Sequence, residues 1–424
     1  MRMRINTVST MTTKRLLAPA VLLGTAALLL TGCASADRPA GTRASDTATT
    51  DRTRTDPART DPARTDTGHR VTLTVDGGLL VLDQDLRVVG EHDVDGFTRV
   101  NPAGDDRHVL VTVPEGFRVL DTAAGTTGET VLTDLTFPAD TGGHVVVHGD
   151  RTALFADGSG DVTTFDTADL GTAVASGELP DADTTESEAA HHGVAIELED
   201  GTLLTTIGTE ESRSGVRALD ADGQETARSE ECPDVHGEGA VADEVAVFGC
   251  SDGALVYRDG AFEKLDAPTE YGRSGNLFTT ETSSIAVGDF NDDPDSEGYL
   301  LEQVALVDAA AGEYRVADLP DGVGFTFRDL ARGPGDSAVV LGSDGALHVL
   351  DEETGKSLDT VPVIDAWEGP AEWQDAHPAL KVVDDIAYVT DPAERRVTAV
   401  DLETGDVVAT SDRLPGVPNE IAVV

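Results

Sequence analysis

The chain has 424 residues, with 79 Asp or Glu against 30 Lys or Arg, and its formal net charge is −49 at pH 7. Such an acidic protein is repelled by phosphate backbones and anionic membrane surfaces, which excludes nucleic acid as a partner and favours cations as ligands. Hydrophobic residues still make up 39% of the chain. A substantial core is therefore expected, with the acidic side chains outside it. Acidity alone favours solubility or salt tolerance over cation binding as the reason for their number.

The N-terminal residues have the pattern of a bacterial lipoprotein signal. Lys14 and Arg15 precede an apolar run over 16–30, which matches the hydrophobic region of a signal peptide and is short for a membrane span. The run ends in Leu-Thr-Gly-Cys, where small residues permit cleavage before Cys33 and its thiol takes diacylglycerol. We expect residues 1–32 to be removed and the lipid to hold the protein at the outer face of the cell membrane, outside the cytoplasm. An ordinary signal peptide with a chance cysteine is the alternative.

The segment 33–69, which begins with the lipidated cysteine, is predicted to be a disordered linker. It consists mostly of Thr, Ala, Asp, Arg and Pro, and it repeats Arg-Thr-Asp-Pro-Ala at 54–58 and 59–63. Such a segment buries too little apolar surface to offset the entropy of ordering. Its prolines and mixed charges suit an extended spacer between the membrane and the folded domain.

A repeat of about forty-four residues fills the remainder of the chain. An apolar strand bounded by a Gly turn and an Asp recurs at 78–83, 116–121, 160–166, 345–351 and 396–405. Several short strands per unit at a period in the forties predict the blades of a β-propeller.

The two ends of the repeat region predict how the ring closes. Residues 71–95 supply only part of a blade, and 419–424 has the pattern of a lone inner strand, so pairing the two would complete one blade and remove the exposed edges. We therefore expect an all-β fold with one domain over 70–424, eight blades and a monomeric state. Seven blades are the alternative, and an open solenoid or two sandwiches are less favoured because neither needs a split repeat.

Two cysteines remain after Cys33, namely Cys232 and Cys250. In an oxidising compartment an isolated pair is expected to form a disulfide, here between the ends of two strands of one sheet. Two thiolate metal ligands are the alternative, which oxidation outside the cytoplasm disfavours.

Histidines recur where the blades' inner strands are expected to start. Because inner strands of a propeller start on the same face, these side chains would surround one mouth of the central channel, and imidazoles from separate rigid elements suit Zn²⁺. Hydrogen bonding of the histidines to loop backbone is the alternative. The candidate ligands are His144, His191, His192, His236 and His377.

Two further residues are candidates for the same site. Glu238 would be a fourth ligand or would fix a histidine tautomer. His148 lies at the far end of its strand, so it is expected lower in the channel or outside it. The acidic stretch 289–295 alternates oxygen ligands like a Ca²⁺ loop but lacks the usual turn glycine, which favours a surface loop. We find neither a nucleophile-elbow serine nor a phosphate loop and expect no enzyme, with a metal-assisted hydrolase as the less favoured alternative.

Several motifs resemble the AztD family of zinc metallochaperones over nearly the whole folded region. The Cys-Pro-Asp-Val-His-Gly-Glu phrase with its matching second cysteine is the most specific of them. The matching stretches are 143–148, 191–195, 209–217, 231–238, 248–260 and 331–334.

The resemblance implies a secreted propeller that binds Zn²⁺ and passes it to the solute-binding protein of a zinc ABC transporter. His144, His148, His191, His192 and His236 lie on the family's histidine motifs, whereas His377 comes from the strand pattern alone. One departure concerns transfer. An early blade of the family often carries a His-rich loop, but residues 122–129 of this chain contain no histidine, which implies slower, different or lost transfer. A metal-free scaffold for protein–protein interaction is the competing function.

Overall fold

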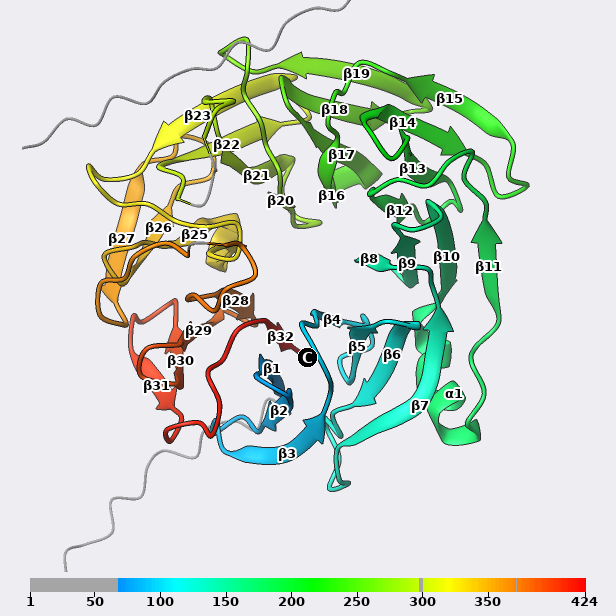
Figure 1. Cartoon of the computed structure of the whole chain (residues 1–424). Helices are drawn as coiled ribbons and strands as arrows, with labels where there is room; N and C mark the ends of the chain where they lie inside the picture. Colours follow the sequence, from blue (N-terminus) through cyan, green and yellow to red (C-terminus); the bar gives the residue numbers. More distant parts are fainter. Residues whose placement is uncertain (1–67, 297–299, 371) are drawn as a thin grey trace, which may run out of the picture. The chain divides into compact units, whose positions relative to one another are not determined.

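The computed structural model describes residues 68–296, 300–370 and 372–424. The predicted signal peptide, the lipidated Cys33 and nearly all of the predicted linker lie outside these residues. The described chain forms eight four-stranded antiparallel sheets around a central channel (Figure 1). The prediction of an eight-bladed all-β propeller is confirmed, and the seven-bladed alternative is wrong.

The first half of the ring contains four blades, each with four strands in order from the channel outward. They are β32 (Ile421–Val423), β1 (Val71–Val75), β2 (Gly78–Leu82), β3 (Val88–Asp93); β4 (Val100–Pro102), β5 (His108–Val113), β6 (Gly116–Asp121), β7 (Val131–Pro138); β8 (Gly142–His148), β9 (Arg151–Ala156), β10 (Asp161–Asp166), β11 (Ala182–Thr185); and β12 (Ala195–Glu197), β13 (Leu203–Gly208), β14 (Arg213–Leu219), β15 (Glu225–Ser229).

The second half repeats the arrangement, and short helices are confined to connections. The blades are β16 (His236–Val241), β17 (Val245–Cys250), β18 (Gly253–Arg258), β19 (Ala261–Asp266); β20 (Leu277–Phe278), β21 (Ile285–Phe290), β22 (Gln303–Asp308), β23 (Glu313–Asp318); β24 (Leu330–Arg332), β25 (Ala338–Leu341), β26 (Ala346–Leu350), β27 (Ser357–Pro362); and β28 (Leu380–Val383), β29 (Ile386–Asp391), β30 (Arg396–Asp401), β31 (Val407–Thr410). The helices are α1 (Leu170–Ser176), η1 (Thr167–Asp169), η2 (Ala242–Glu244) and η3 (Pro334–Asp336).

The ring closes by pairing the first strand with the last, as the split repeat predicts. Strand β1 pairs antiparallel with β32, with Leu73 opposite Ile421. The chain also enters the ring slightly before the predicted boundary. His69 is buried, with Nδ1 3.3 Å from the Tyr388 hydroxyl and Nε2 3.2 Å from Asp384. It therefore packs against the folded domain although its position in the sequence predicted a linker residue.

Burial follows the radial position of each strand. The middle strand β17 is buried at every residue because the neighbouring blades cover both faces of its sheet, whereas the outer strand β31 is mostly exposed. Apolar clusters fill the spaces between blades. One of them joins Val194 and Leu204 of one blade to Phe248 and Leu255 of the next. This packing holds the blades as rigid supports for the residues at the channel.

The inner strands line the channel, and each contacts its neighbours along much of the ring. Every blade enters the ring by its inner strand except the closing blade, whose inner strand is the end of the chain. Residues near the starts of inner strands therefore gather at one mouth of the channel, although they are far apart in sequence. Within the described residues, no helix has both the length and the apolar composition that crossing a bilayer requires.

Candidate metal centre

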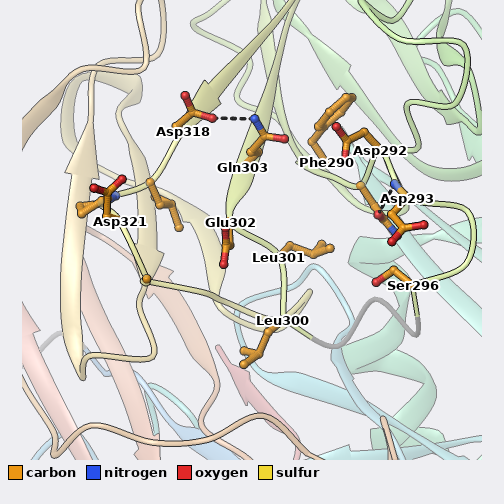
Figure 2. Close-up of a pocket in the computed structure, with 14 residues that line it drawn as sticks. Phe290, Asp292, Asp293, Ser296, Leu300, Leu301, Glu302, Gln303, Asp318 and Asp321 are labelled. Atoms are coloured by element: carbon orange, nitrogen blue, oxygen red, sulfur yellow. Dashed lines mark hydrogen bonds between the residues drawn. The ribbon is translucent and has the colours of Figure 1, made fainter.

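Within the part of the chain that the structure describes, the acidic stretch 289–295 takes part in no group of three or more ligand-type side chains that could share an ion. It borders a cavity of about 730 Å³ whose walls carry Asp292, Asp293, Asp318 and Asp321. Figure 2 shows these carboxylates spread around the cavity, with Asp318 accepting a hydrogen bond from Gln303 Nε2 at 2.6 Å. Among the described residues, the only group of three or more ligand-type side chains close enough to share an ion lies elsewhere and contains histidines.

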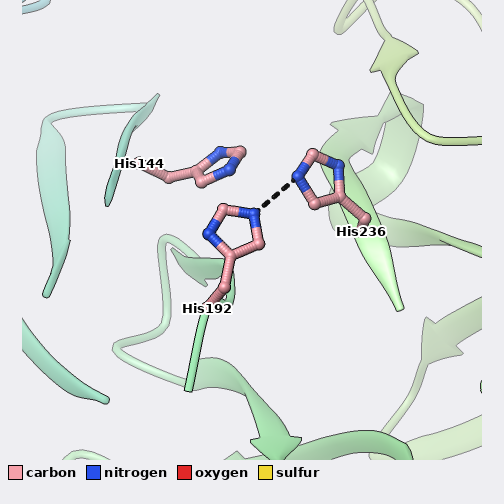
Figure 3. A group of neighbouring side chains, drawn as sticks. All are labelled: His144, His192 and His236. Carbon is pink, nitrogen blue, oxygen red and sulfur yellow. Dashed lines mark hydrogen bonds between the residues drawn. The ribbon is translucent and has the colours of Figure 1, made fainter. Parts of the chain in front are cut away.

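That group consists of His144, His192 and His236, whose ligand atoms lie within 4.8 Å of one another. The ring centroids are 5.2 Å apart for His144 and His192, 4.9 Å for His144 and His236, and 5.0 Å for His192 and His236. The three residues come from consecutive blades, on β8, just before β12 and at the first residue of β16. Figure 3 shows the three imidazoles pointing toward one another.

The hydrogen bonds of two imidazoles fix their tautomers. His192 Nδ1 lies 2.7 Å from Asp157 Oδ2, and His236 Nδ1 is in hydrogen-bond contact with the Gly275 carbonyl oxygen. A carboxylate and a carbonyl can only accept, so both Nδ1 atoms carry the proton and both Nε2 atoms present lone pairs. These Nε2 atoms lie 2.9 Å apart. Two lone pairs at this distance repel unless a cation, either a proton or a metal ion, lies with them.

His144 completes the group from the adjacent blade. Its Nε2 atom is buried and has no hydrogen-bond partner among the described residues. Its Nδ1 atom lies 3.9 Å from Glu238 Oε1. A buried ring nitrogen without a partner is costly, and a metal ion at this point would satisfy it.

Burial disfavours the protonated form of two of the three histidines. Desolvation lowers the pKa of His236 to about 3 and lowers the pKa of His144 well below its usual value, and neighbouring histidines and arginines add to both effects. Desolvation also raises the pKa of Glu238 to about 8. Neutral imidazoles are the form that binds a metal ion, so protons compete weakly with zinc at these two residues.

Two glycines allow the backbone beside the histidines to pack closely against neighbouring residues. A Cβ at Gly143 would lie 2.1 Å from Asp157 Oδ1, so a larger residue would displace the carboxylate that orients His192. Gly237 follows His236 with φ +69°, a left-handed conformation that suits glycine, and a Cβ there would lie 2.9 Å from Asn276 Cα. The Gly-His and His-Gly pairs in the sequence therefore have a structural reason.

The histidines face a cavity of about 460 Å³ that opens at the channel mouth. Trp373 and Phe327 lie on its wall, and Trp373 packs edge-on against Phe97 with ring centroids 5.5 Å apart. Phe97 and Trp373 are 43% and 38% exposed, so the mouth has an aromatic rim.

The donor set fits Zn²⁺. Zinc takes nitrogen ligands at about 2.0–2.1 Å in tetrahedral geometry, which places two nitrogens roughly 3.3 Å apart. Three imidazole nitrogens within 4.8 Å of one another need only small side-chain shifts to meet this spacing. They would leave one coordination position facing the cavity, available for water or for an incoming ligand.

The structure does not bring the other candidate histidines to this group. His191 points away because adjacent residues of an extended segment face opposite sides, and it binds Ala189 O and Thr206 Oγ1 at 2.8 and 3.0 Å. His148 contacts Glu244 with Nε2 2.9 Å from Oε1, at the other end of β8. His377 lies before β28, and its Nδ1 donates to Asp375 O at 2.7 Å. Glu238 lies beside His144 but makes no hydrogen bond to it, since its Oε1 is 3.9 Å from His144 Nδ1.

The structure contains a disulfide between Cys232 and Cys250, with Cα atoms 4.9 Å apart. It joins the segment before β16 to the end of β17 in the same sheet. The Cys232 N–H also donates to Ser214 O at 3.2 Å, which ties this segment to the neighbouring blade. The segment leads directly to His236, so the disulfide holds one of the three histidines in place.

Sequence reasoning missed the groups that orient and surround the histidines. Asp157 lies in a turn after β9, and Gly275 acts through its backbone, so neither has a motif of its own. Several arginines near the site were also missed, because the net charge of the chain is strongly negative. Arg99, Arg213 and Arg273 all act to lower the pKa of one or both of His144 and His236.

Comparisons with known proteins agree with the fold. No family model matches the chain. The zinc chaperone AztD of Citrobacter koseri is 24% identical to this chain over 217 residues. The alignment covers 50% of this chain, and the chain spans about half the length of that relative. Two solved structures of the Citrobacter koseri protein superpose with TM-scores of 0.69 (apo) and 0.68, covering 84% of this chain and 97% of theirs. Their sequence identities of 18% and 20% show the shared fold alone.

Proposed function

We propose that this protein binds one Zn²⁺ through His144, His192 and His236 and delivers it to the solute-binding protein of a zinc ABC transporter. The observation that carries the proposal is the pair of fixed tautomers, which aim two Nε2 lone pairs at each other 2.9 Å apart. The similarity to the zinc chaperone AztD supports the same function.

The open coordination position supports delivery of zinc over permanent storage. A partner ligand can enter from the 460 Å³ cavity and bind zinc before the first histidine leaves. The aromatic rim of Phe97 and Trp373 offers apolar contact area around the site. The net charge of −49 requires a neutral or basic contact face on the partner, because two acidic faces would repel.

We also propose that the protein works outside the cytoplasm, held at the outer face of the cell membrane by a lipid on Cys33. Support comes from the lipoprotein pattern of residues 16–33 and from the disulfide, which persists in oxidising compartments. Incorporation of a labelled fatty acid into the wild-type protein and its loss in Cys33→Ala would test the anchor.

Zinc transfer to the solute-binding protein is the test of function. Zinc-loaded protein is mixed with the metal-free solute-binding protein and a competing chelator, and the transfer rate is followed against partner concentration. A rate that rises with partner concentration supports delivery by contact. A rate equal to that of spontaneous zinc release contradicts it and indicates storage, and turnover of an ester substrate by the zinc form would indicate a hydrolase instead.

A further inference from the structure

A second cavity of about 230 Å³ continues the channel behind His144. It shares Arg99, His144, Asn276 and Phe327 with the cavity at the mouth, so the two adjoin. Its charged lining comes from positions near the starts of inner strands. These residues are Arg99 before β4, Glu238 on β16, Arg328 before β24, Lys381 on β28 and Glu420 before β32.

Two of the three cations in this cavity have no close partner in the described chain. The Lys381 ammonium makes neither a hydrogen bond nor an ion pair within 4 Å with any described residue, although the more distant Glu420 carboxylate acts on it electrostatically. The Arg99 guanidinium donates no hydrogen bond to a described residue, its Nε is buried, and its nearest carboxylate oxygen, Glu420 Oε1, is 4.0 Å away. Lys381 and Arg99 are therefore available to a ligand.

The carboxylates nearby do not neutralise these cations. Glu420 is already engaged by Arg328, whose Nη2 lies 2.7 Å from Oε1. Even with Glu238 ionised, the cavity holds three positive groups against two negative ones. Asp329 is not among the residues that line the cavity, and its Oδ2 is occupied by hydrogen bonds from the Thr326 N–H and hydroxyl, both at 2.7 Å. Burial also raises its pKa to about 8. The charge of this cavity is therefore opposite in sign to the net charge of the chain, which is −49.

Desolvated cations without counter-ions are unfavourable, and burial accordingly lowers the pKa of Lys381. An anion between Lys381 and Arg99 would remove this penalty. The guanidinium fork matches two oxygens of one group better than a spherical ion. The cavity of about 230 Å³ has the volume of roughly eight water molecules at about 30 Å³ each. This is enough for a small oxyanion with some water.

We propose that this cavity binds a small oxyanion, a carboxylate or a tetrahedral anion such as sulfate, between Arg99 and Lys381. Arg328 adds positive charge but is held by Glu420 and by the Trp373 carbonyl oxygen, so it supports the site more than it contacts the ligand.

The site is coupled to zinc, a step that rests on the proposed function. Three neutral imidazoles leave the full charge of Zn²⁺ uncompensated beside Arg99, which borders both cavities. An anion in the second cavity offsets that charge. Zinc and anion therefore bind with positive cooperativity, and each raises the affinity for the other by the same factor.

The test begins with the full chain free of metal. Isothermal titration with succinate and with sulfate, at constant ionic strength and against chloride, distinguishes a carboxylate site from a tetrahedral one. We expect one oxyanion per chain to bind at least ~10-fold more tightly than chloride. Lys381→Met and Arg99→Met should each weaken binding ~10-fold or more, and Lys356→Met, which removes an exposed lysine, should leave it unchanged.

Binding no tighter than that of chloride, or equal binding by wild type and both cavity variants, would overturn the proposal. Thermal unfolding of each variant without anion identifies any that fails to fold, and Lys381→Arg, which retains the charge, should keep oxyanion binding. In a second arm, zinc affinity is measured with and without saturating succinate, and it should rise in wild type but not in Lys381→Met. If the protein bound no zinc, the proposed function would be wrong. The titration of the metal-free protein would still show whether the oxyanion site exists.

Discussion

On one side of the channel, three consecutive blades place His144, His192 and His236 within three residues of the start of an inner strand. On the other side, the blades of β24, β28 and β32 place Arg328, Lys381 and Glu420 at corresponding points. The fold gives both sets the same access to the channel. Neutral imidazoles carry no net charge, so their lone pairs can converge on one point around a bound cation, whereas fixed cations must be separated or paired with carboxylates.

His377 shows that the position alone does not make a ligand. It lies before β28 on the basic side of the channel, where burial and Arg328 lower its pKa to about 4. Its Nδ1–H binds Asp375 O, and its ring lies 6.4 Å from Phe327, away from the other histidines. A metal site also needs acceptors that turn the ring nitrogens toward a common point, as Asp157 and Gly275 do for His192 and His236.

The largest expected effect is the loss of zinc affinity when two of the three histidines are replaced. His192→Ala/His236→Ala should reduce zinc affinity at least ~1,000-fold, about 4 kcal/mol, because two of three ligands disappear. Competition with a chelator of known affinity measures this. His92→Gln, at a histidine on outer strand β3, is the control and should bind zinc like wild type. Equal zinc affinity in wild type and double variant would show that zinc binds elsewhere.

The second difference between the histidine side and the basic side of the channel is the disulfide. It braces the segment that carries His236, and no corresponding bond braces the described segment of Lys381. Cys232→Ser/Cys250→Ser should lower the free energy of unfolding by about 3 kcal/mol, the value expected for a loop of this length. Denaturant titration measures it. A loss well below 1 kcal/mol would mean that strand pairing alone holds the segment.

Removing the acceptor behind His192 should have a smaller effect. Asp157→Ala frees Nδ1 of His192, so the ring can rotate and change tautomer, and zinc affinity should fall ~10-fold. Asp150→Ala, an exposed acid in the same blade, removes the same charge and serves as the control. A fall of equal size in both variants would point to long-range charge instead of orientation of the ring.

On the basic side of the channel, the buried Asp329 should make the protein less stable as pH rises. Burial raises the pKa of Asp329 to about 8, so the folded protein retains this proton while the unfolded chain loses it near pH 4. Stability from this group is therefore present at low pH and declines as pH rises from about 4 to 8, by roughly 1 kcal/mol per pH unit. Asp329→Asn mimics the protonated form and should unfold with a flatter pH profile. An unchanged profile would mean that Asp329 is ionised in the folded protein.

The smallest effect is expected at His377. His377→Ala should change zinc affinity less than ~2-fold, about 0.4 kcal/mol, because the ring does not reach the other three. The same chelator competition measures it, with the double histidine variant as the reference for lost binding. A loss of 10-fold or more would bring His377 into the site and show that this side of the channel moves when zinc binds.

The repeat explains why the fold was predictable in detail. Each blade carries its own strand and turn pattern, and the incomplete first and last units predict the pairing of β1 with β32. The same alignment placed His144, His192 and His236 at one channel mouth. The rest of the site depends on contacts that have no pattern in sequence. These contacts are the Asp157 acceptor, the Gly275 carbonyl and the nearby arginines, Arg99, Arg213 and Arg273.

The most direct test of the zinc site is a crystal structure of the zinc-loaded protein with anomalous scattering measured at the zinc edge. We predict one dominant anomalous peak at about 2.0–2.1 Å from one ring nitrogen of each of His144, His192 and His236. His192 and His236 should bind through Nε2, with their Nδ1–H bonds to Asp157 and Gly275 preserved. A fully occupied zinc ion in the acidic cavity of Figure 2, with none at the three histidines, would contradict the assignment.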